Sequence, residues 1–235
     1  MAAKEDFLEK ELKKLHDLEN LRDAFFNKLF ILDYTKDKKE RIKLIKQAKE
    51  LAQKIPELKG WPKDKERFWD VESYGWNNKI PKEVRAKIED WLKKRSKKNI
   101  LSLGAGCCPY LKDLTLIDIS DEMLKQAQGK KKIRLDLDKE KLPFKDQSFD
   151  TIIMSFILDY LKSPRKVIKE AKRVLKNKGN LLIIQSKIPV DDFYRMQEKK
   201  HIDKKMLNKL LKNSDLIIEE KIINNKAILF AEAKV

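Results

Sequence analysis

From Asn99 to the end of the chain, short apolar segments with strand character alternate with helical segments. The segment 148–156 is apolar on both faces, as expected of a central parallel strand. The last two strands meet at Asn224-Asn225, a turn that is typical of an antiparallel hairpin. Alternation that ends in a hairpin predicts an open, doubly wound α/β sheet. The other predicted strands cover 99–103, 114–118, 132–137 and 180–186.

Residues 1–58 show helical periodicity throughout, with apolar residues three or four positions apart. The pattern breaks at 34–37 and stops at Pro56, which predicts two helices joined as an antiparallel hairpin. We expect the apolar stripe of this hairpin to pack on the rest of the chain, and a coiled-coil partner is the alternative. The N-terminus is charged from Lys4 onward and lacks the apolar stretch of a signal peptide.

Residues 59–79 contain three of the four tryptophans of the chain and follow no regular pattern. Aromatic side chains at this density indicate either a packed hinge or the wall of a binding site. Pro81 then starts a helix that continues to about Arg95. The sequence therefore predicts three regions: a helical hairpin at 1–58, an aromatic lid with a connecting helix at 59–98, and an α/β domain at 99–235.

The chain carries a formal net charge of +17, which is distributed unevenly. The net charge is +5 over 61–98, zero over 99–150 and +9 over 151–235. One interpretation is a basic surface that faces a polyanion such as RNA, and the other is a generally Lys-rich composition. Only nine of the 55 basic residues are Arg, whereas specific phosphate and base contacts favour Arg. RNA and a small molecule both stay candidate partners.

No apolar run approaches the roughly 18 residues that a membrane helix needs. Cys107 and Cys108 are adjacent and cannot cross-link a fold, which favours a reducing compartment. A metal site would need more ligands, and His16 and His201 lie far from this pair in the sequence. We therefore expect a soluble, cytoplasmic protein without membrane contact or metal, in which the two cysteines fill a tight turn.

Three successive strand ends carry residues that suit a nucleoside. The first strand leads into the loop LGAGCC, where Gly104 and Gly106 permit a sharp turn and close approach of a ligand. Asp118 ends the second strand and can accept hydrogen bonds from both hydroxyls of a ribose. Asp136, or Asp138 beside it, comes at the end of the third strand and can reach an adenine amino group. Because ligands of open α/β sheets bind at these strand ends, the pattern predicts a nucleoside pocket.

Residues 99–186 resemble the class I S-adenosylmethionine-dependent methyltransferases through four segments in order: ILSLGAG, LIDISDEML, LDLDKEKLPFKDQSFDTIIMSFIL and SPRKVIKEAKRVLKNKGNLLII. The terminal hairpin shares the resemblance more weakly. The combination LPF.D.SFD followed by RVLK..G.LLI is specific to this family. The resemblance implies a Rossmann-like, seven-stranded sheet with an antiparallel last strand. It also implies S-adenosylmethionine as cofactor and transfer of its methyl group to RNA or a small molecule.

The resemblance further implies roles for individual residues. Relatives often place an N-terminal lid over the cofactor, and Tyr74 and Trp76 lie at that place in the chain. The loop residues would line the methionine part of the cofactor, and the acids would bind its ribose and adenine. The implied positions are Gly104, Ala105 and Gly106 for methionine, Asp118 for ribose, Ile119 and Met123 for adenine or ribose, Asp136 and Leu137 for the adenine edge, and Ser155 and Phe156 near the transferred methyl.

Two positions depart from the family pattern. Ser102 stands where an acid is usual, and can reach the cofactor's amino group through water but without a charge. Cys108 replaces a third glycine, and the connection between the first two strands is short. The alternative to an active enzyme is therefore a catalytically degenerate factor that binds or assembles with RNA or protein.

Asp159 follows the fourth strand and is the candidate general base, provided that it lies near the acceptor. The alternative is a solvent-exposed acid at the start of a helix. Methyl transfer to a good nucleophile depends mainly on alignment of donor and acceptor, so activity does not require a base.

Overall fold

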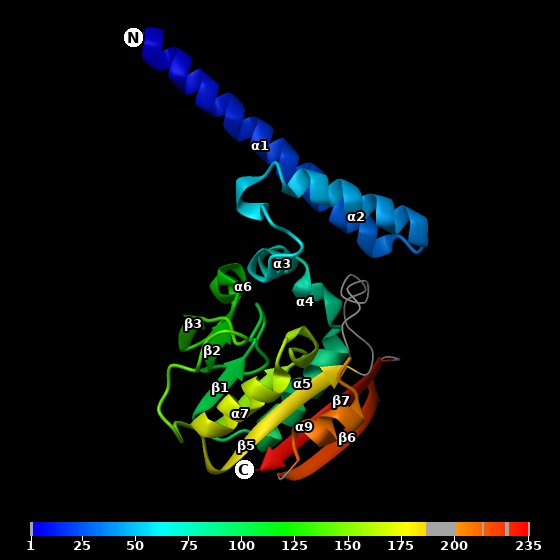
Figure 1. The fold of residues 1–235 in the computed structure, drawn as a ribbon, viewed down its shortest axis with the longest axis vertical. Coiled ribbons are helices and arrows are strands. Elements are labelled where there is room, and N and C mark those ends of the chain that lie inside the picture. Colours follow the sequence, from blue (N-terminus) through cyan, green and yellow to red (C-terminus); the bar gives the residue numbers. More distant parts are fainter. Residues whose placement is uncertain (1, 187–200, 213, 224–225, 235) are drawn as a thin grey trace. The chain divides into compact units, whose positions relative to one another are not determined.

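The computed structural model describes residues 2–186, 201–212, 214–223 and 226–234 (Figure 1). The chain divides into two compact units, Met1–Val71 and Glu72–Val235. The division falls within 59–98, so the aromatic segment is shared between the two units. Among the described residues, no helix is both long enough and apolar enough to cross a membrane.

The first unit contains the predicted N-terminal helices. Helix α1 (Ala2–Tyr34) is followed after a short turn by α2 (Lys38–Ala52), η1 (Pro56–Leu58) and α3 (Lys65–Glu72). Phe25 and Leu32 of α1 are buried, as are the apolar residues on one face of α2. Leu12 and Leu15 are exposed. The apolar stripe of α1 is therefore not covered at these two positions, which corrects the expectation that the stripe packs on the rest of the chain.

A seven-stranded sheet forms the centre of the second unit, with the strand order β3-β2-β1-β4-β5-β7-β6 (Figure 1). Strands β1 to β5 pair in parallel, and β7 is antiparallel to both β5 and β6. This confirms the predicted doubly wound sheet with an antiparallel last strand. The strands are β1 (Ile100–Leu103), β2 (Thr115–Asp118), β3 (Lys131–Arg134), β4 (Phe149–Ser155), β5 (Leu175–Ser186), β6 (Asp215–Ile223) and β7 (Lys226–Lys234).

Strand β3 is shorter than predicted. It ends at Arg134, so Asp136 and Leu137 belong to the loop that follows. The predicted hairpin turn at Asn224-Asn225 lies outside the described residues, although β6 and β7 pair up to both of its sides.

Helices cover both faces of the sheet because side chains alternate along each strand. On β4, Ile152 and Met154 join an apolar cluster with α7 (Pro164–Val174) and α9 (Lys204–Leu210), here called the α7-side cluster. Ile153 between them joins a cluster with α5 (Lys82–Arg95), the α5-side cluster. The two-sided apolar pattern of 148–156 thus arises because helices cover both faces of β4. The remaining helices of the described part are α4 (Trp76–Lys79), α6 (Asp121–Gln126) and η2 (Leu158–Tyr160).

The motif segments LPFKD and RVLK meet at Arg173 of α7. Its guanidinium donates to the carbonyls of Leu142 (3.1 Å) and Phe144 (2.9 Å). It also donates to the carboxylates of Asp146 (2.6 Å) and Glu170 (2.9 Å). A planar group with five donors can satisfy these acceptors together, which a Lys ammonium cannot. These contacts fix the loop before β4 to α7, so this part of the motif supports the fold.

Candidate functional site

The loop after β1 turns sharply at the carboxyl edge of the sheet. Gly104 and Gly106 have left-handed backbone conformations, with φ of 61° and 62°. A Cβ atom at Gly104 would lie 2.0 Å from Cδ1 of Ile157, in the loop after β4. Close packing between these neighbouring loops therefore requires glycine here, whether or not a ligand is present. The N–H of Ala105 donates to the carbonyl of Ile117 (3.0 Å) and holds the loop against β2.

Asp118 ends β2 with a buried side chain. Its Oδ2 accepts a hydrogen bond from the N–H of Gly106 (2.8 Å), and its Oδ1 accepts one from the N–H of Ser120 (3.0 Å). One carboxylate therefore connects the loops after β1 and β2. A carboxylate has about four acceptor positions, so it can accept from these two N–H groups and from further donors such as the hydroxyls of a ribose.

The short helix α6 follows Asp118. Ser120 caps it by accepting a hydrogen bond from the N–H of Met123 (3.0 Å). Met123 is almost fully buried, whereas Ile119 is partly exposed. Of these two implied adenine or ribose contacts, Ile119 offers surface to a ligand and Met123 contributes to the packing of the domain.

The loop after β3 uses its two acids differently. Asp138 accepts hydrogen bonds from the N–H groups of Lys162 (2.8 Å) and Ser163 (3.2 Å), just before α7. Asp136 accepts one from the N–H of Asp138 (3.0 Å) and pairs with the exposed Lys139 (3.2 Å). Asp138 thus joins two loops of the protein. Asp136, held by a local turn and a surface lysine, is the acid better suited to an adenine amino group.

Two implied cofactor contacts have buried side chains. Leu137 packs in the α7-side cluster, so its backbone is the part that can face a ligand. Ser102 is buried within β1, where it pairs with Leu116 of β2 and Ile153 of β4. Because Ser102 lies inside the strand, its hydroxyl would reach the amino group of a cofactor through water and not directly.

The end of β4 carries an unsatisfied polar group and a strained residue. The hydroxyl oxygen of Ser155 is buried and has no hydrogen-bond partner among the described residues. Such a group costs about 1–3 kcal/mol, so it points to a ligand that would satisfy it. Phe156 has a φ of 55°, an unusual conformation for a large side chain and one that is concentrated at functional sites. The Phe156 ring is buried in the α5-side cluster.

Asp159 lies in η2 with a buried side chain. Its carboxylate accepts hydrogen bonds from Nε2 of Gln185 (2.8 Å) and the N–H of Ile202 (2.7 Å), and it lies 2.8 Å from Nδ1 of His201. The interpretation of Asp159 as an exposed acid is therefore wrong. The His201 contact escaped the sequence analysis because 42 positions separate the two residues and no local pattern links them.

Of the two predicted lid residues, Trp76 lies at the glycine loop. It is buried, and its indole nitrogen would be 3.6 Å from a Cβ placed on Gly106. It also makes an edge contact with the ring of Tyr160, with centroids 6.5 Å apart. Tyr74, by contrast, is 66% exposed.

The cysteine pair has no catalytic features. Cys107 is buried, with its Sγ 3.4 Å from that of Cys108. Burial and the neighbouring thiol raise the pKa of Cys107 to about 12, so the thiol stays protonated and is a poor nucleophile. Tyr110, two positions further on, packs against the α5-side cluster beside Arg85.

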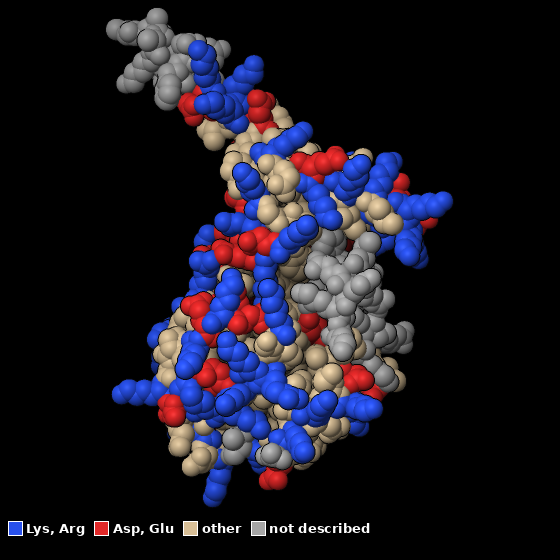
Figure 2. Space-filling model, viewed as in Figure 1, with Lys and Arg blue, Asp and Glu red and all other residues tan. Residues whose placement is uncertain are grey.

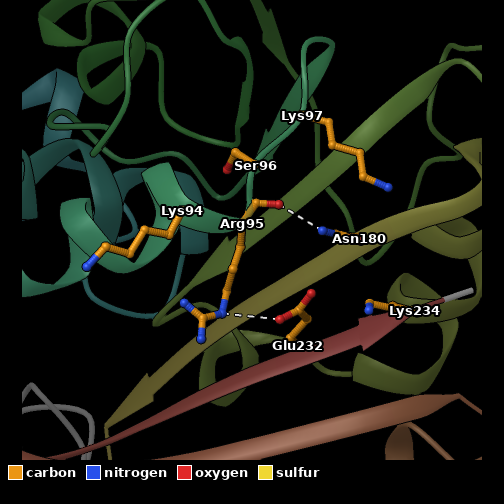
Figure 3. A pocket seen from close by; sticks show the side chains of 7 residues that line it. All are labelled: Lys94, Arg95, Ser96, Lys97, Asn180, Glu232 and Lys234. Atoms are coloured by element: carbon orange, nitrogen blue, oxygen red, sulfur yellow. Dashed lines mark hydrogen bonds and ion pairs between the residues drawn. The ribbon is translucent and has the colours of Figure 1, made fainter.

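A separate basic hollow of about 560 Å³ lies at the amino edge of the parallel strands (Figure 3). Its guanidinium, from Arg95, is neutralised by Glu232 (3.1 Å) and Glu219 (3.0 Å). Cofactors of such sheets bind at the opposite, carboxyl edge, so this hollow is not the nucleoside site. It is lined by Lys94, Arg95, Ser96, Lys97, Asn180, Glu232 and Lys234.

The carboxyl edge therefore combines a glycine turn, a buried acid at the end of β2, an acid after β3 and, at the end of β4, a hydroxyl without a hydrogen-bond partner among the described residues. These acceptors and donors fit a ligand with a ribose and an amino-bearing base. Fold and site together define a Rossmann-like nucleoside-binding domain.

Comparison with known proteins identifies the family. Residues 101–183 match the family described as methyltransferase domain. The chain is 35% identical over 127 residues to the uncharacterized protein MJ1123 of Methanocaldococcus jannaschii, which covers 52% of this chain and 59% of that protein. It is 41% identical over 95 residues to the ubiquinone/menaquinone biosynthesis C-methyltransferase UbiE of Rickettsia massiliae, covering 35% and 38%. The chain thus spans less than two thirds of either relative.

A solved structure shares the fold. It is a SAM-dependent methyltransferase of Thermotoga maritima, described as a possible histamine N-methyltransferase. The TM-score is 0.56 at 15% identity, over 71% of this chain and 99% of that one. Residues 101–183 of the second unit thus match the methyltransferase domain family, and the second unit has the fold of the S-adenosylmethionine-dependent methyltransferases. S-adenosylmethionine is the cofactor of this family, and the polar groups of the carboxyl edge fit it.

Proposed function

We propose that this protein binds S-adenosylmethionine at the carboxyl edge of its sheet and transfers the methyl group to an acceptor. The observation that carries the proposal is the buried Asp118 carboxylate, fixed by the N–H groups of Gly106 and Ser120. When bound, the cofactor supplies an electrophilic methyl carbon. Asp118 would orient the ribose and Asp136 the adenine, while the free hydroxyl of Ser155 would hydrogen-bond near the reacting groups.

A degenerate binding factor is the alternative raised by Ser102 and Cys108. Two observations support cofactor binding. The loop keeps left-handed conformations at Gly104 and Gly106 although Cys108 replaces the third glycine. The buried hydroxyl of Ser155 has no hydrogen-bond partner among the described residues, and a ligand at this edge would satisfy it.

The acceptor is RNA or a small molecule in this proposal. The net charge of +17 supports a polyanion. The likeness to UbiE, a C-methyltransferase of quinone biosynthesis, supports a small molecule. Dependence of acceptor binding on salt separates the two classes, because phosphate contacts release counterions.

Calorimetric titration with S-adenosylmethionine and S-adenosylhomocysteine tests the proposed cofactor. We expect both ligands to bind one site per chain. Mass spectrometry of the denatured protein should first establish that no nucleoside was purified with it. A cooperatively melting, nucleoside-free sample that gives no heat with either ligand would contradict the proposal.

A further inference from the structure

The pair of Asp159 and His201 lies at the same edge of the sheet as the glycine loop. The short segment after β4, which includes Asp159, also contacts the glycine loop and Trp76. Ile157 packs directly on Gly104, and Tyr160 contacts Trp76, which lies over Gly106. Asp159 stands between these two contact residues in the chain, and its carboxylate holds His201 and accepts from Gln185 near the carboxyl end of β5.

The imidazole of His201 is held by a carboxylate that is itself fixed. Oδ2 of Asp159 lies 2.8 Å from Nδ1 of His201 and also accepts a hydrogen bond from Gln185 (2.8 Å). Oδ1 accepts one from the N–H of Ile202 (2.7 Å). The Asp159 side chain is only 6% exposed and that of His201 is 22% exposed. The carboxylate is thus fixed by the fold, and part of the imidazole ring is accessible, although its Nε2 atom is itself buried.

This geometry selects one protonation form of the ring. An ionised carboxylate only accepts hydrogen bonds, so the contact places a proton on Nδ1. In the neutral imidazole, Nε2 is then the basic nitrogen. The arrangement matches the general pattern in which a buried acid orients a histidine that takes a proton from a reacting group.

We infer that His201 accepts the proton of the methyl acceptor and that Asp159 is its positioning residue. This inference rests on the proposed function and narrows the acceptor to a group with a dissociable O–H or N–H. The acceptor oxygen or nitrogen forms the bond to the methyl carbon, and the carbon–sulfur bond breaks with its electron pair left on sulfur. The acceptor proton passes to Nε2 of His201, and the carboxylate of Asp159 stabilises the imidazolium.

A purely structural role is the competing explanation. The Ile202 contact alone would attach this part of the chain to η2, and His201 would then be a packing residue. The two explanations differ in whether the charge on the reacting sulfur changes the protonation of the His201 ring. S-adenosylmethionine carries a positive sulfonium, whereas S-adenosylhomocysteine has a neutral thioether and otherwise the same contacts.

Nitrogen-15 NMR of the histidines of the full chain separates these explanations, because the chain has only two. His201→Gln identifies the His201 signals, and His16→Gln on the exposed face of α1 is the matched control. We expect Nδ1 to be protonated and Nε2 unprotonated at neutral pH. The Asp159 carboxylate faces the ring in both complexes, so the two complexes differ in the positive charge on sulfur. Because a nearby positive charge disfavours the imidazolium, we expect the ring to titrate about half a pH unit lower, or more, with S-adenosylmethionine than with S-adenosylhomocysteine.

In Asp159→Asn, we expect this fixed proton position to be lost while cofactor affinity changes less than twofold. Equal titration midpoints in the two complexes, with calorimetry showing that both ligands bind, would overturn the inference and leave the proposed function intact. A proton on Nε2 in the S-adenosylmethionine complex would also overturn it. If neither ligand binds, the proposed function itself fails.

Discussion

At residue scale, the carboxylate of Asp118 accepts hydrogen bonds from two backbone N–H groups and is the proposed ribose ligand. Hydrogen bonds to a charged group contribute about 1.5–3 kcal/mol, and about 1.4 kcal/mol is a factor of ten in affinity. We therefore expect Asp118→Ala to weaken binding of S-adenosylhomocysteine roughly tenfold or more in calorimetry. Asp121→Ala, at the exposed start of α6, is the control and should bind as the wild type does. Equal affinities for the two variants would speak against this ribose site.

Trp76 and Tyr74 provide a second matched pair. The indole of Trp76 is buried against Gly106, whereas Tyr74 is exposed. We expect Trp76→Ala to change the affinity for S-adenosylhomocysteine severalfold, since a buried aromatic contact is worth about 1 kcal/mol. Tyr74→Ala should leave it unchanged. The ligand should also alter tryptophan fluorescence in the wild type and less so in Trp76→Phe. No effect of either alanine substitution would rule out a lid at this position.

Some residues of the candidate site were predictable from the sequence and others were not. Gly104, Gly106 and Asp118 follow strand ends, and strand ends meet at one edge by the geometry of a parallel sheet. Their placement was therefore predictable from local pattern. His201 was not, because its contact with Asp159 depends on how the chain returns to the sheet after β5. Sequence patterns report periodicity and turns, and they carry no signal for such a distant pair.

At element scale, the turn between β1 and β2 depends on glycine for a packing reason. At Gly104 a side chain would meet Ile157 and would also have to adopt a positive φ. We expect Gly104→Ala to lower the free energy of unfolding by about 1–3 kcal/mol in urea titrations. Gly75→Ala is the control, because its Cβ would meet nothing within 4 Å. Equal stability of the two variants would show that this turn is not tightly packed.

Arg173 connects α7 to the loop before β4 and also gives stability a pH dependence. Its hydrogen bond to Glu170 holds the pKa of that carboxyl below its ordinary value of 4.5. A lowered pKa stabilises the fold above the unfolded value, and this stabilisation is lost as the pH falls through the folded value. We expect Arg173→Lys to lower stability by about 1–2 kcal/mol at pH 7, and by less near pH 3. Thermal melts at both pH values check this.

Arg165→Lys, on the exposed side of the same helix, is the control for Arg173→Lys and should melt as the wild type does. A loss of stability in Arg173→Lys that is the same at pH 7 and pH 3 would contradict the role of Glu170. Cofactor affinity should be unchanged in both variants, because these contacts lie within the fold and not at the carboxyl edge.

The element limits show what periodicity can and cannot predict. The two-sided apolar pattern of 148–156 predicted β4 because a central strand is covered on both faces. β3 ends at Arg134 because its partner β2 ends at Asp118, and the acids that follow accept backbone N–H groups within a loop. In α1, helical spacing placed Leu12 and Leu15 on a stripe, but spacing does not reveal whether another element covers them.

At the scale of the whole molecule, positive and negative side chains are interspersed on the face that Figure 2 shows. Figure 2 shows Lys and Arg over much of the visible face with Asp and Glu among them. Several lysines pair with an acid three or four positions away, such as Lys14 with Glu11 and Lys94 with Asp90. Pairs of this kind reduce the local field, so we expect attraction to RNA to depend on the net excess of positive charge.

This distribution leads to a salt-dependence prediction. If RNA is the acceptor, a labelled single-stranded RNA should lose roughly tenfold or more in affinity between 50 and 200 mM salt, as about three phosphate contacts would produce. Fluorescence anisotropy measures this loss. An affinity that does not depend on ionic strength, or no RNA binding at 50 mM salt, would favour the small-molecule acceptor.

Because Asp118 ties the glycine loop to the start of α6, the disorder of both loops is removed when the chain folds and not when a ligand arrives. Association with the nucleoside should therefore be rapid and accompanied by little rearrangement of these two loops. The amide hydrogens of Gly106 and Ser120 should exchange slowly with solvent even before ligand is added, which makes them direct reporters of a preorganised site.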